Sequence, residues 1–152
     1  MSPEYLAGFF DGEGCIDNQV MYAKPPYDNR FYVRPRLRLA QANNGAFILK
    51  EIQATFGGSI RHRPKGTGNQ QDSASWELLS KDVVIEMLRM LEPLLIIKKQ
   101  QARLALWWFD NCAGKTIPEA ARRAFNEELK MMKRDPQRLS EEAAARIESL
   151  MR

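Results

Sequence analysis

The chain has 152 residues, 44% of them hydrophobic, a net charge of +4 and a pI near 9.2. This size predicts one domain over residues 1–152, with a C-terminal helical extension at about 116–152. No apolar run approaches the roughly 18 residues that span a bilayer, and the N-terminus lacks the features of a signal peptide, so we expect a soluble, intracellular protein. The two cysteines match no metal spacing and are too few for a disulfide framework, which fits a reducing compartment. The positive charge is concentrated in residues 24–65, and such a patch suggests a polyanionic partner.

The N-terminal residues predict a helix that begins at Pro3. Ser2 suits the N-cap, Pro3 suits the first helical position, and Glu4 is favourable near the positive end of the helix dipole. Residues 5–10 are apolar apart from the small pair Ala7-Gly8. Glycine costs about 0.5–1 kcal/mol in a helix interior, so we expect another backbone, most simply a second helix, to approach closely there.

Two carboxylates follow at the unfavourable, C-terminal end of this helix. Asp11 and Glu13 alternate with Gly12 and Gly14, which are expected to allow a left-handed turn that exposes the last carbonyls. Carboxylate and carbonyl oxygens together suit a hard cation such as Mg²⁺. The alternative is an acidic, solvated helix end followed by a turn.

The next segments predict two β-hairpins with basic faces. Residues 15–22 are expected to form a strand, and a turn around 23–29 precedes a strand over 31–41, in which apolar residues alternate with a row of arginines about 6–7 Å apart. Pro35 predicts an edge or a bulge at its position. A second hairpin is expected at 59–64 and 73–79, joined by a polar loop at 65–71. The arginine row has no acidic cross-strand candidate in this interpretation, which favours a bound phosphate backbone over a merely solvated face.

The remaining segments predict helices. Residues 44–55 carry an expected apolar stripe of Phe47, Ile48, Ile52 and Phe56, and Gly57-Gly58 end the helix. Further helices are expected over 83–91, over 94–108, from Pro118 to about Met132, and from Ser140 onward. The element order is α-β-β-α-β-β-α followed by helices, an α+β fold with an antiparallel four-stranded sheet whose polar face suits a DNA major groove.

The run Leu6 to Gly14 resembles the nine-residue signature of the LAGLIDADG homing endonucleases. It departs from that signature at Phe9, Phe10, Gly12 and Glu13. The resemblance implies the same α-β-β-α-β-β-α fold through about Leu106, and a homodimer, because the chain carries one motif. In this family the motif helix packs on its twin and the final acidic residue binds the metal, which implies that Glu13, with the Gly12 carbonyl, is the metal site. The implied subunit contact is Leu6, Ala7, Gly8, Phe9, Asp11 and Gly12.

The resemblance also implies further pocket residues. Gln41 stands where relatives carry a polar residue that orients the attacking water, and Lys98 stands where they carry a lysine that stabilises developing charge. Some relatives have an arginine near position 45, but this chain has Gly45, so Lys99 is an alternative basic group. Lys98 is alternatively only a solvated lysine in the first half of a helix, but its apolar flanks Ile96-Ile97 favour the catalytic interpretation.

The function expected from these features is sequence-specific hydrolysis of both strands of a long pseudo-palindromic DNA by a homodimer. The implied cofactor is Mg²⁺ or Mn²⁺, with Ca²⁺ as a non-cleaving substitute, and no small-molecule cofactor or membrane is expected. Catalysis is assigned to Glu13, Gln41 and Lys98. DNA contact is assigned to Asp17, Gln19, Met21, Tyr32, Arg34, Arg36, Arg38, Arg61, Arg63, Lys65, Asn69, Gln70, Ser73, Ser75 and Glu77. The alternatives are an RNA splicing maturase on the same fold and a non-catalytic DNA-binding regulator.

Overall fold

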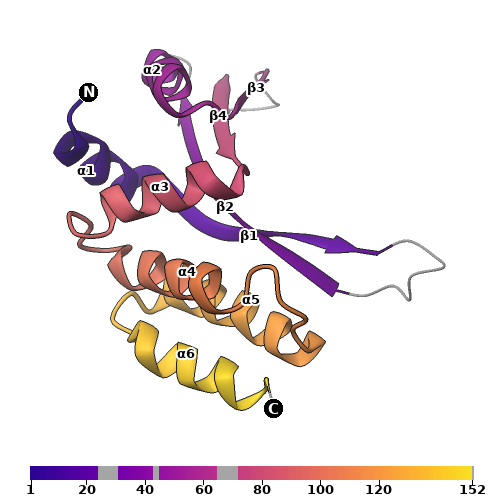
Figure 1. The fold of residues 1–152 in the computed structure, drawn as a ribbon. Helices are drawn as coiled ribbons and strands as arrows, with labels where there is room; N and C mark the ends of the chain where they lie inside the picture. Colours follow the sequence, from indigo (N-terminus) through magenta and orange to yellow (C-terminus); the bar gives the residue numbers. More distant parts are fainter. Residues whose placement is uncertain (24–30, 43–44, 65–71, 152) are drawn as a thin grey trace. The chain divides into compact units, whose positions relative to one another are not determined.

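Strand and helix follow the expected order along the chain (Figure 1). A computed structural model describes residues 1–23, 31–42, 45–64 and 72–151. Its elements are α1 (Pro3–Glu13), β1 (Gly14–Tyr22), β2 (Phe31–Ala42), α2 (Ala46–Phe56), β3 (Ser59–Arg63), β4 (Ser73–Leu78), α3 (Lys81–Leu91), α4 (Lys99–Asn111), α5 (Glu119–Arg134) and α6 (Ser140–Ser149). The four strands form one sheet in the order β1-β2-β4-β3. The predicted α+β class with an antiparallel four-stranded sheet is therefore confirmed.

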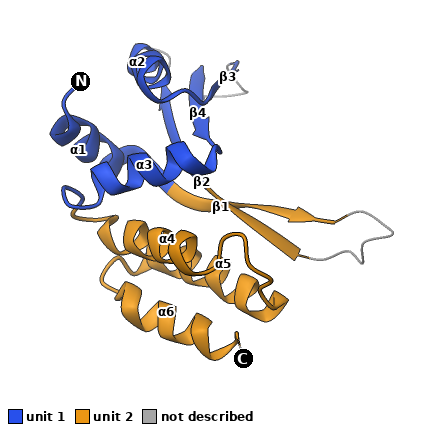
Figure 2. Ribbon diagram, in the orientation of Figure 1, with its two compact units in different colours: residues 1–15, 36–95 blue, residues 16–35, 96–152 orange. Residues whose placement is uncertain are grey.

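The chain divides into two compact units (Figure 2). Unit 1 contains residues 1–15 and 36–95, and unit 2 contains residues 16–35 and 96–152. The boundary runs through β1 and β2, so unit 2 combines the first hairpin strands with the C-terminal helices. The expectation of one domain over residues 1–152, with a C-terminal helical extension at about 116–152, stays a prediction.

Unit 1 has its core between the sheet and its three helices. Alternation in β2 buries Leu37 and Leu39, and alternation in β4 buries Trp76 and Leu78. The indole N–H of Trp76 donates to the Gly57 carbonyl at 2.8 Å. A Cβ on Gly58 would lie 2.6 Å from the same indole nitrogen, and both glycines have positive φ. The predicted Gly57-Gly58 helix end is thus confirmed and required by the Trp76 contact.

Unit 2 has a separate core among α4, α5 and α6. Trp108 and Phe125 stack with their ring centroids 4.3 Å apart, and Val33 of β2 packs against this cluster. Cys112 is buried there, and burial raises the pKa of its thiol. In the same unit, the buried Glu128 carboxylate accepts hydrogen bonds from Arg138 and Arg146.

Three local expectations were wrong. Helix α1 continues through Gly12, and Gly14 has φ −82°, so neither residue makes a left-handed turn. Gly14 is needed for another reason, because a Cβ there would lie 2.6 Å from the Phe10 carbonyl oxygen. In α2, Ile52 is buried as expected, but Leu49 is the other buried residue and Phe47 is 63% exposed, so the predicted stripe is only partly correct.

The third difference concerns the start of α4. The sequence predicted a helix from residue 94, but α4 begins at Lys99. The amide N–H groups of Leu94 and Leu95 both donate to the Leu91 carbonyl, so these residues cap the end of α3. Leu95 is buried by this turn, while Ile96 is 85% exposed.

Candidate functional site

Helix α1 places its motif as the sequence predicts. The Ser2 side chain accepts a hydrogen bond from the Tyr5 N–H at 3.1 Å, and Pro3 is the first helical residue. Leu6, Ala7 and Phe10 face the core of unit 1. Gly8 and Gly12 are among the exposed residues of α1, and the assignment of Leu6 and Ala7 to a subunit contact stays a prediction.

Both of those glycines face open space. Apart from the adjoining residues and the nearby backbone of α1 itself, no described atom lies within 4 Å of a Cβ built on Gly8 or on Gly12. A larger side chain at either position therefore meets nothing within its own chain. The close neighbour expected for Gly8 is not supplied by the described part of this chain, so it stays a prediction about a second copy.

Glu13 is the last residue of α1 and is exposed, whereas Asp11 is half-buried. The last carbonyls of a helix lack an intrahelical donor, and the Gly12 carbonyl belongs to that turn. Over the described ranges, no three His, Cys, Asp or Glu side chains gather into a group that could hold a metal ion. At this end of α1, Glu13 is the exposed carboxylate and Asp11 the half-buried one.

Gln41 lies near the end of β2, in unit 1 with Glu13. By strand alternation it shares the side of β2 that carries Leu37 and Leu39, and it is half-buried. Its side-chain oxygen lies 2.7 Å from the position that a Cβ would occupy on Gly45. Glycine at position 45 therefore leaves the space in which the Gln41 amide sits.

Lys98 occupies the N-cap position of α4 and is half-buried. It was expected inside the first half of a helix, which is wrong because α4 begins one residue later. It belongs to unit 2, whereas Glu13 and Gln41 belong to unit 1. Ile96 and Ile97, its expected apolar flanks, are both exposed.

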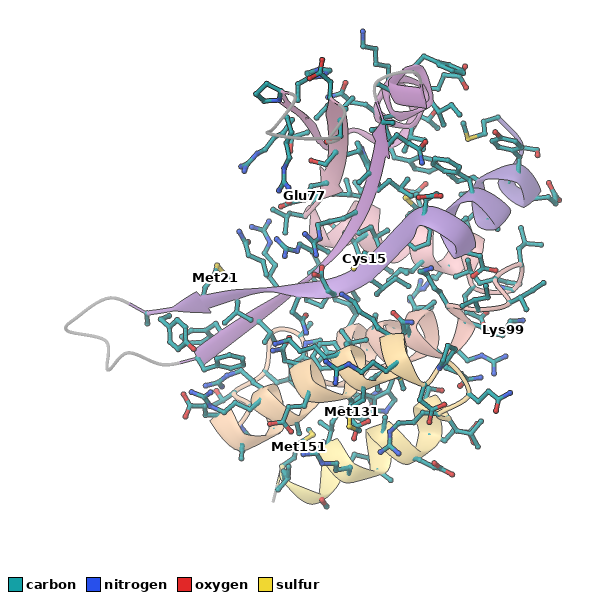
Figure 3. All side chains as sticks on the ribbon, turned by 180° about the vertical axis from the view of Figure 1, so that it is seen from behind. Cys15, Met21, Glu77, Lys99, Met131 and Met151 are labelled. Carbon is teal, nitrogen blue, oxygen red and sulfur yellow. The ribbon has the colours of Figure 1, made fainter. Side chains whose placement is uncertain are left out.

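The arginine row on β2 alternates as predicted, but its charge is partly offset. Arg34 is exposed, while Arg36 and Arg38 are half-buried. Glu77 of β4 stands opposite Arg38 in the strand register, and its carboxylate lies 3.8 Å from Arg36. The expectation that no acid faces the row was wrong; Figure 3 labels Glu77 on β4.

The second hairpin presents its polar residues on one face, as expected. Arg61 pairs with Ser75 and Arg63 pairs with Ser73. Both arginines are exposed, as is His62 between them. The predicted contacts Lys65, Asn69 and Gln70 lie outside the described residues.

The first hairpin contains the remaining predicted contacts, all in unit 2. Gln19 is half-buried and Met21 is 41% exposed. The Asp17 side chain is only 14% exposed and lies 4.0 Å from Lys133 of α5. Tyr32 carries the Arg122 guanidinium 4.8 Å from its ring centroid. Helix α5 was not included in the predicted site, and the separation of these residues along the chain left no sequence signal for the contact.

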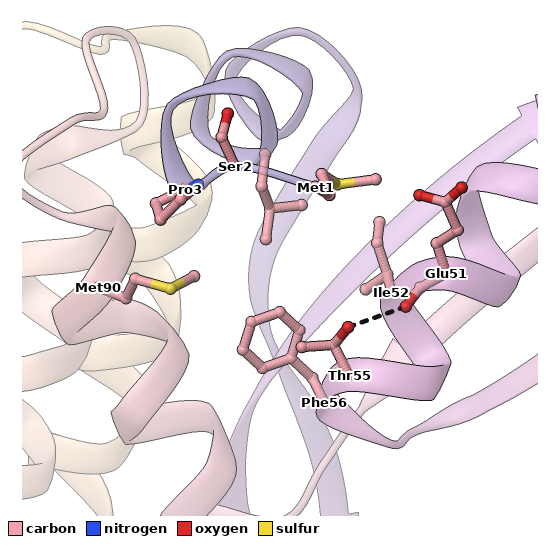
Figure 4. Close-up of a pocket in the computed structure, with 9 residues that line it drawn as sticks. Met1, Ser2, Pro3, Glu51, Ile52, Thr55, Phe56 and Met90 are labelled. Carbon is pink, nitrogen blue, oxygen red and sulfur yellow. Dashed lines mark hydrogen bonds between the residues drawn. The ribbon is translucent and has the colours of Figure 1, made fainter.

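A small pocket in unit 1 is lined mostly by apolar side chains, and Glu13, Gln41 and Lys98 are not among its lining residues (Figure 4). Its volume is about 140 Å³, and α1, α2 and Met90 of α3 line it. The Thr55 hydroxyl beside it donates to the Glu51 carbonyl at 3.2 Å, as in an ordinary helix turn.

Among residues 1–23, 31–42, 45–64 and 72–151, none of the helices has the length and apolar character that a bilayer span requires.

Comparison with known proteins agrees with these features. The chain is 32% identical to the DNA endonuclease I-CvuI of Chlorella vulgaris over 103 residues, which is 67% of this chain and 60% of that protein. A crystal structure of I-CvuI with a DNA target and Mg²⁺ superposes with a TM-score of 0.71 at 25% identity, covering 97% of this chain and 93% of that one. Another structure of I-CvuI contains its target and Ca²⁺.

A more distant likeness shows the fold. The archaeal intron-encoded homing endonuclease I-Vdi141I, complexed with DNA, has a TM-score of 0.64 at 15% identity and covers 97% of this chain and 95% of its own. The sequence profile described as LAGLIDADG endonuclease matches residues 6–103, which include the motif of α1, the whole sheet and the start of α4. The chain belongs to the LAGLIDADG endonuclease family.

Proposed function

We propose that this chain is a homing endonuclease that hydrolyses both strands of a long pseudo-palindromic DNA target with divalent metal ions. The observation that carries this proposal is the exposed Glu13 carboxylate at the end of a motif helix whose Gly8 and Gly12 face open space. The basic side chains on β2 and β3 support a polyanionic substrate.

The residues at the end of α1 fit a hard cation. Glu13 would hold Mg²⁺ or Mn²⁺, with the Gly12 carbonyl as a second oxygen ligand, and water, phosphate oxygens and the partner copy would supply the others. Ca²⁺ is expected to bind at the same oxygens without supporting cleavage. When bound, the metal supplies an activated water and stabilises the charge that develops around phosphorus.

Gln41 and Lys98 are proposed to act on the same reaction through their side chains. The Gln41 amide can donate to and accept from a water, and so orient it toward phosphorus. The Lys98 ammonium would offset negative charge on the phosphate. Lys98 is the N-cap residue of α4 and is half-buried.

A second copy would complete the site. One chain contributes one exposed carboxylate, and a twofold dimer is the commonest way to bring two such groups together. Small residues allow helix axes to approach to about 8 Å, the lower end of the usual range, and Gly8 and Gly12 supply that surface. Each subunit would then read half of a pseudo-palindromic target.

The test compares Glu13→Gln with Glu4→Gln, an equivalent change at the exposed, opposite end of the same helix. We expect Glu13→Gln to abolish strand cleavage while DNA affinity stays the same or rises, because a metal ligand and a negative charge near phosphate are both lost. Glu4→Gln is expected to cleave at the wild-type rate. Wild-type cleavage by Glu13→Gln in Mg²⁺ would show that the metal assignment is wrong.

A further inference from the structure

Strand β4 pairs with only the second half of β2. Leu37–Ala42 pair with β4, whose residues in that register are Ser73–Leu78. Residues 31–36 therefore have no β4 residue opposite them in this register. Strand edges expose N–H and C=O groups that must find other partners, and Pro35 already removes one donor from this stretch.

Helix α5 supplies those partners at Phe31. The Phe31 N–H donates to the Glu119 carboxylate at 2.9 Å, and the Arg122 Nε–H donates to the Phe31 carbonyl at 2.6 Å. Arg122 also donates through Nη1 to the Ile117 carbonyl. Both polar groups of one strand residue are thus bound by side chains from the first turn of α5, as a neighbouring strand would bind them.

Two cation–π contacts also join α5 to β2. The Arg122 guanidinium lies 4.8 Å from the Tyr32 ring centroid, and the Arg123 guanidinium lies 4.4 Å from the Phe31 ring centroid. Phe31 also packs edge-on against Tyr22 of β1, with centroids 5.8 Å apart. We call Glu119, Arg122 and Arg123, with the Phe31 and Tyr32 that they hold, the hairpin clasp.

The contacts of the clasp lower the pKa of the Glu119 carboxyl. The Phe31 N–H that donates to the Glu119 carboxylate, aided by Arg123 and Arg122, lowers the pKa of this carboxyl despite its desolvation. The ionised form is therefore the one that the clasp favours. Arg123 also lies 3.6 Å from the same carboxylate, one helical turn away.

Helix α5 reaches the other strand of the hairpin further along its length. The Asn18 side chain of β1 is buried and donates to Asn126 at 3.4 Å, and Lys133 lies 4.0 Å from Asp17. The helix therefore contacts the hairpin at two separate places, one on each strand. Such contacts fix both strands against the same rigid element.

We propose that Glu119 and Arg122 are positioning residues that hold the β1–β2 hairpin in the conformation in which its outward side chains meet DNA. This inference rests on the proposed function. The exposed Arg34 stands two residues beyond Tyr32 on the same side of β2, so the clasp fixes the strand immediately before it. A pre-organised hairpin loses less conformational freedom on binding and discriminates better among base pairs.

The first arm of the test measures amide hydrogen exchange in the full chain without DNA. In Glu119→Ala, the Phe31 amide should exchange at least about tenfold faster than in the wild type, because a hydrogen bond to a charged group is lost. Glu119→Gln keeps an acceptor oxygen and should restore part of the protection. Glu141→Ala, which removes an exposed carboxylate on α6, should change nothing at Phe31. Unchanged exchange at Phe31 in Glu119→Ala would overturn the clasp.

The second arm measures binding to the DNA sequence that the wild type selects from a random pool, and to its single-base variants. Glu119→Ala should lose about tenfold of its discrimination at some base pairs, while single-turnover cleavage at saturating DNA keeps its rate. Glu119→Gln should regain discrimination. Arg122→Lys keeps the positive charge, but a lysine ammonium lacks the planar guanidinium that donates to both the Phe31 and the Ile117 carbonyls. This variant should lose discrimination as Glu119→Ala does, and it provides a second test if Glu119→Ala folds poorly.

Four outcomes test the positioning role and distinguish its failure from failure of the proposed function. Faster exchange with unchanged discrimination would overturn the positioning role, and so would an equal loss of cleavage rate and discrimination that follows a lower melting temperature. If the wild type selects no DNA at all, the proposed function fails and the positioning role falls with it. A wild type that selects and cleaves DNA, beside clasp variants of unchanged specificity, would leave the proposed function intact and reject this inference alone.

Discussion

The Glu77 carboxylate on β4 lies 3.8 Å from the Arg36 guanidinium on β2. In the strand register Glu77 also stands opposite Arg38, so one acid faces two members of the arginine row. In a nuclease this carboxylate would lie among phosphates. It would therefore weaken the attraction of the sheet for DNA.

Glu77→Gln is expected to tighten DNA binding several-fold. The pair with Arg36 is partly exposed and worth only about 0–1 kcal/mol, so its loss costs little stability. Removing a negative charge beside phosphates should also steepen the dependence of affinity on salt. Affinity measured over a salt series, with the exposed Glu86→Gln of α3 as control, checks this. Weaker binding at one base pair only would show that Glu77 instead accepts a hydrogen bond from a base.

Gly45→Ala tests the role of Gln41. The added methyl would meet the Gln41 side-chain oxygen at 2.7 Å, and since that atom is the end of a flexible side chain, the amide should move while the fold persists. A displacement of about 1 Å costs on the order of 10²-fold in rate if the group orients the attacking water. In a Gln41→Ala background the effect of Gly45→Ala should vanish. Equal losses in both backgrounds would mean that Gly45 acts without Gln41.

Gly8→Leu tests the twofold contact. Outside the adjoining residues and the nearby backbone of α1, no described atom lies within 4 Å of a Cβ at this position. Leucine also favours helix over glycine by close to 1 kcal/mol, so the single chain should fold at least as well. The helices of two copies should nevertheless be forced apart, giving a poorly active monomer or aggregate in analytical ultracentrifugation. Ala54→Leu, an exposed substitution on α2, serves as the control. A fully active Gly8→Leu dimer would show that the helix pair is misassigned.

The buried Glu128 predicts a pH-dependent stability of unit 2. Burial raises the pKa of its carboxyl, but hydrogen bonds from Arg138 at 2.5 and 2.9 Å and from Arg146 at 3.0 Å outweigh burial and lower the pKa below its ordinary value. The unfolded chain therefore takes up this proton first. The stabilisation is complete above about pH 4.5 and is lost as pH falls through the lowered folded value.

Glu128→Gln should cost about 2–3 kcal/mol of unfolding free energy at neutral pH, because charge-assisted hydrogen bonds in a buried site are lost. Denaturant unfolding at neutral pH and over a series of acidic pH values below 4.5 measures the loss and its progressive disappearance in acid. Glu127→Gln is the matched control, since Glu127 also binds Arg146 but is mostly exposed, and it should cost less than about 1 kcal/mol. Equal costs for the two changes would contradict the buried network.

Local patterns in the sequence predicted the motif helix and the alternation of β2. Capping at Ser2 and the burial of Leu37 and Leu39 depend on neighbours within a few residues, which sequence spacing reports directly. The position of Glu77 opposite Arg38 depends on the register of two strands far apart in the chain. No local pattern contains that register.

The same reason explains the other misses. Lys98 lies at the start of α4 because the chain continues past Pro93 in turns that cap α3, rather than resuming a helix at once. The contact of Glu119 with Phe31 joins residues 88 positions apart. Both are tertiary effects that propensity alone does not predict.

The most direct measurement is incubation of the wild-type chain with a randomised double-stranded DNA library, followed by sequencing of the new ends. With Mg²⁺ we predict breaks in both strands at one pseudo-palindromic sequence, abolished by EDTA, and binding of the same sequence without cleavage in Ca²⁺. The absence of any selected, cleaved sequence in Mg²⁺ or Mn²⁺, or cleavage that persists in EDTA, would contradict the assignment of this chain as a metal-dependent homing endonuclease.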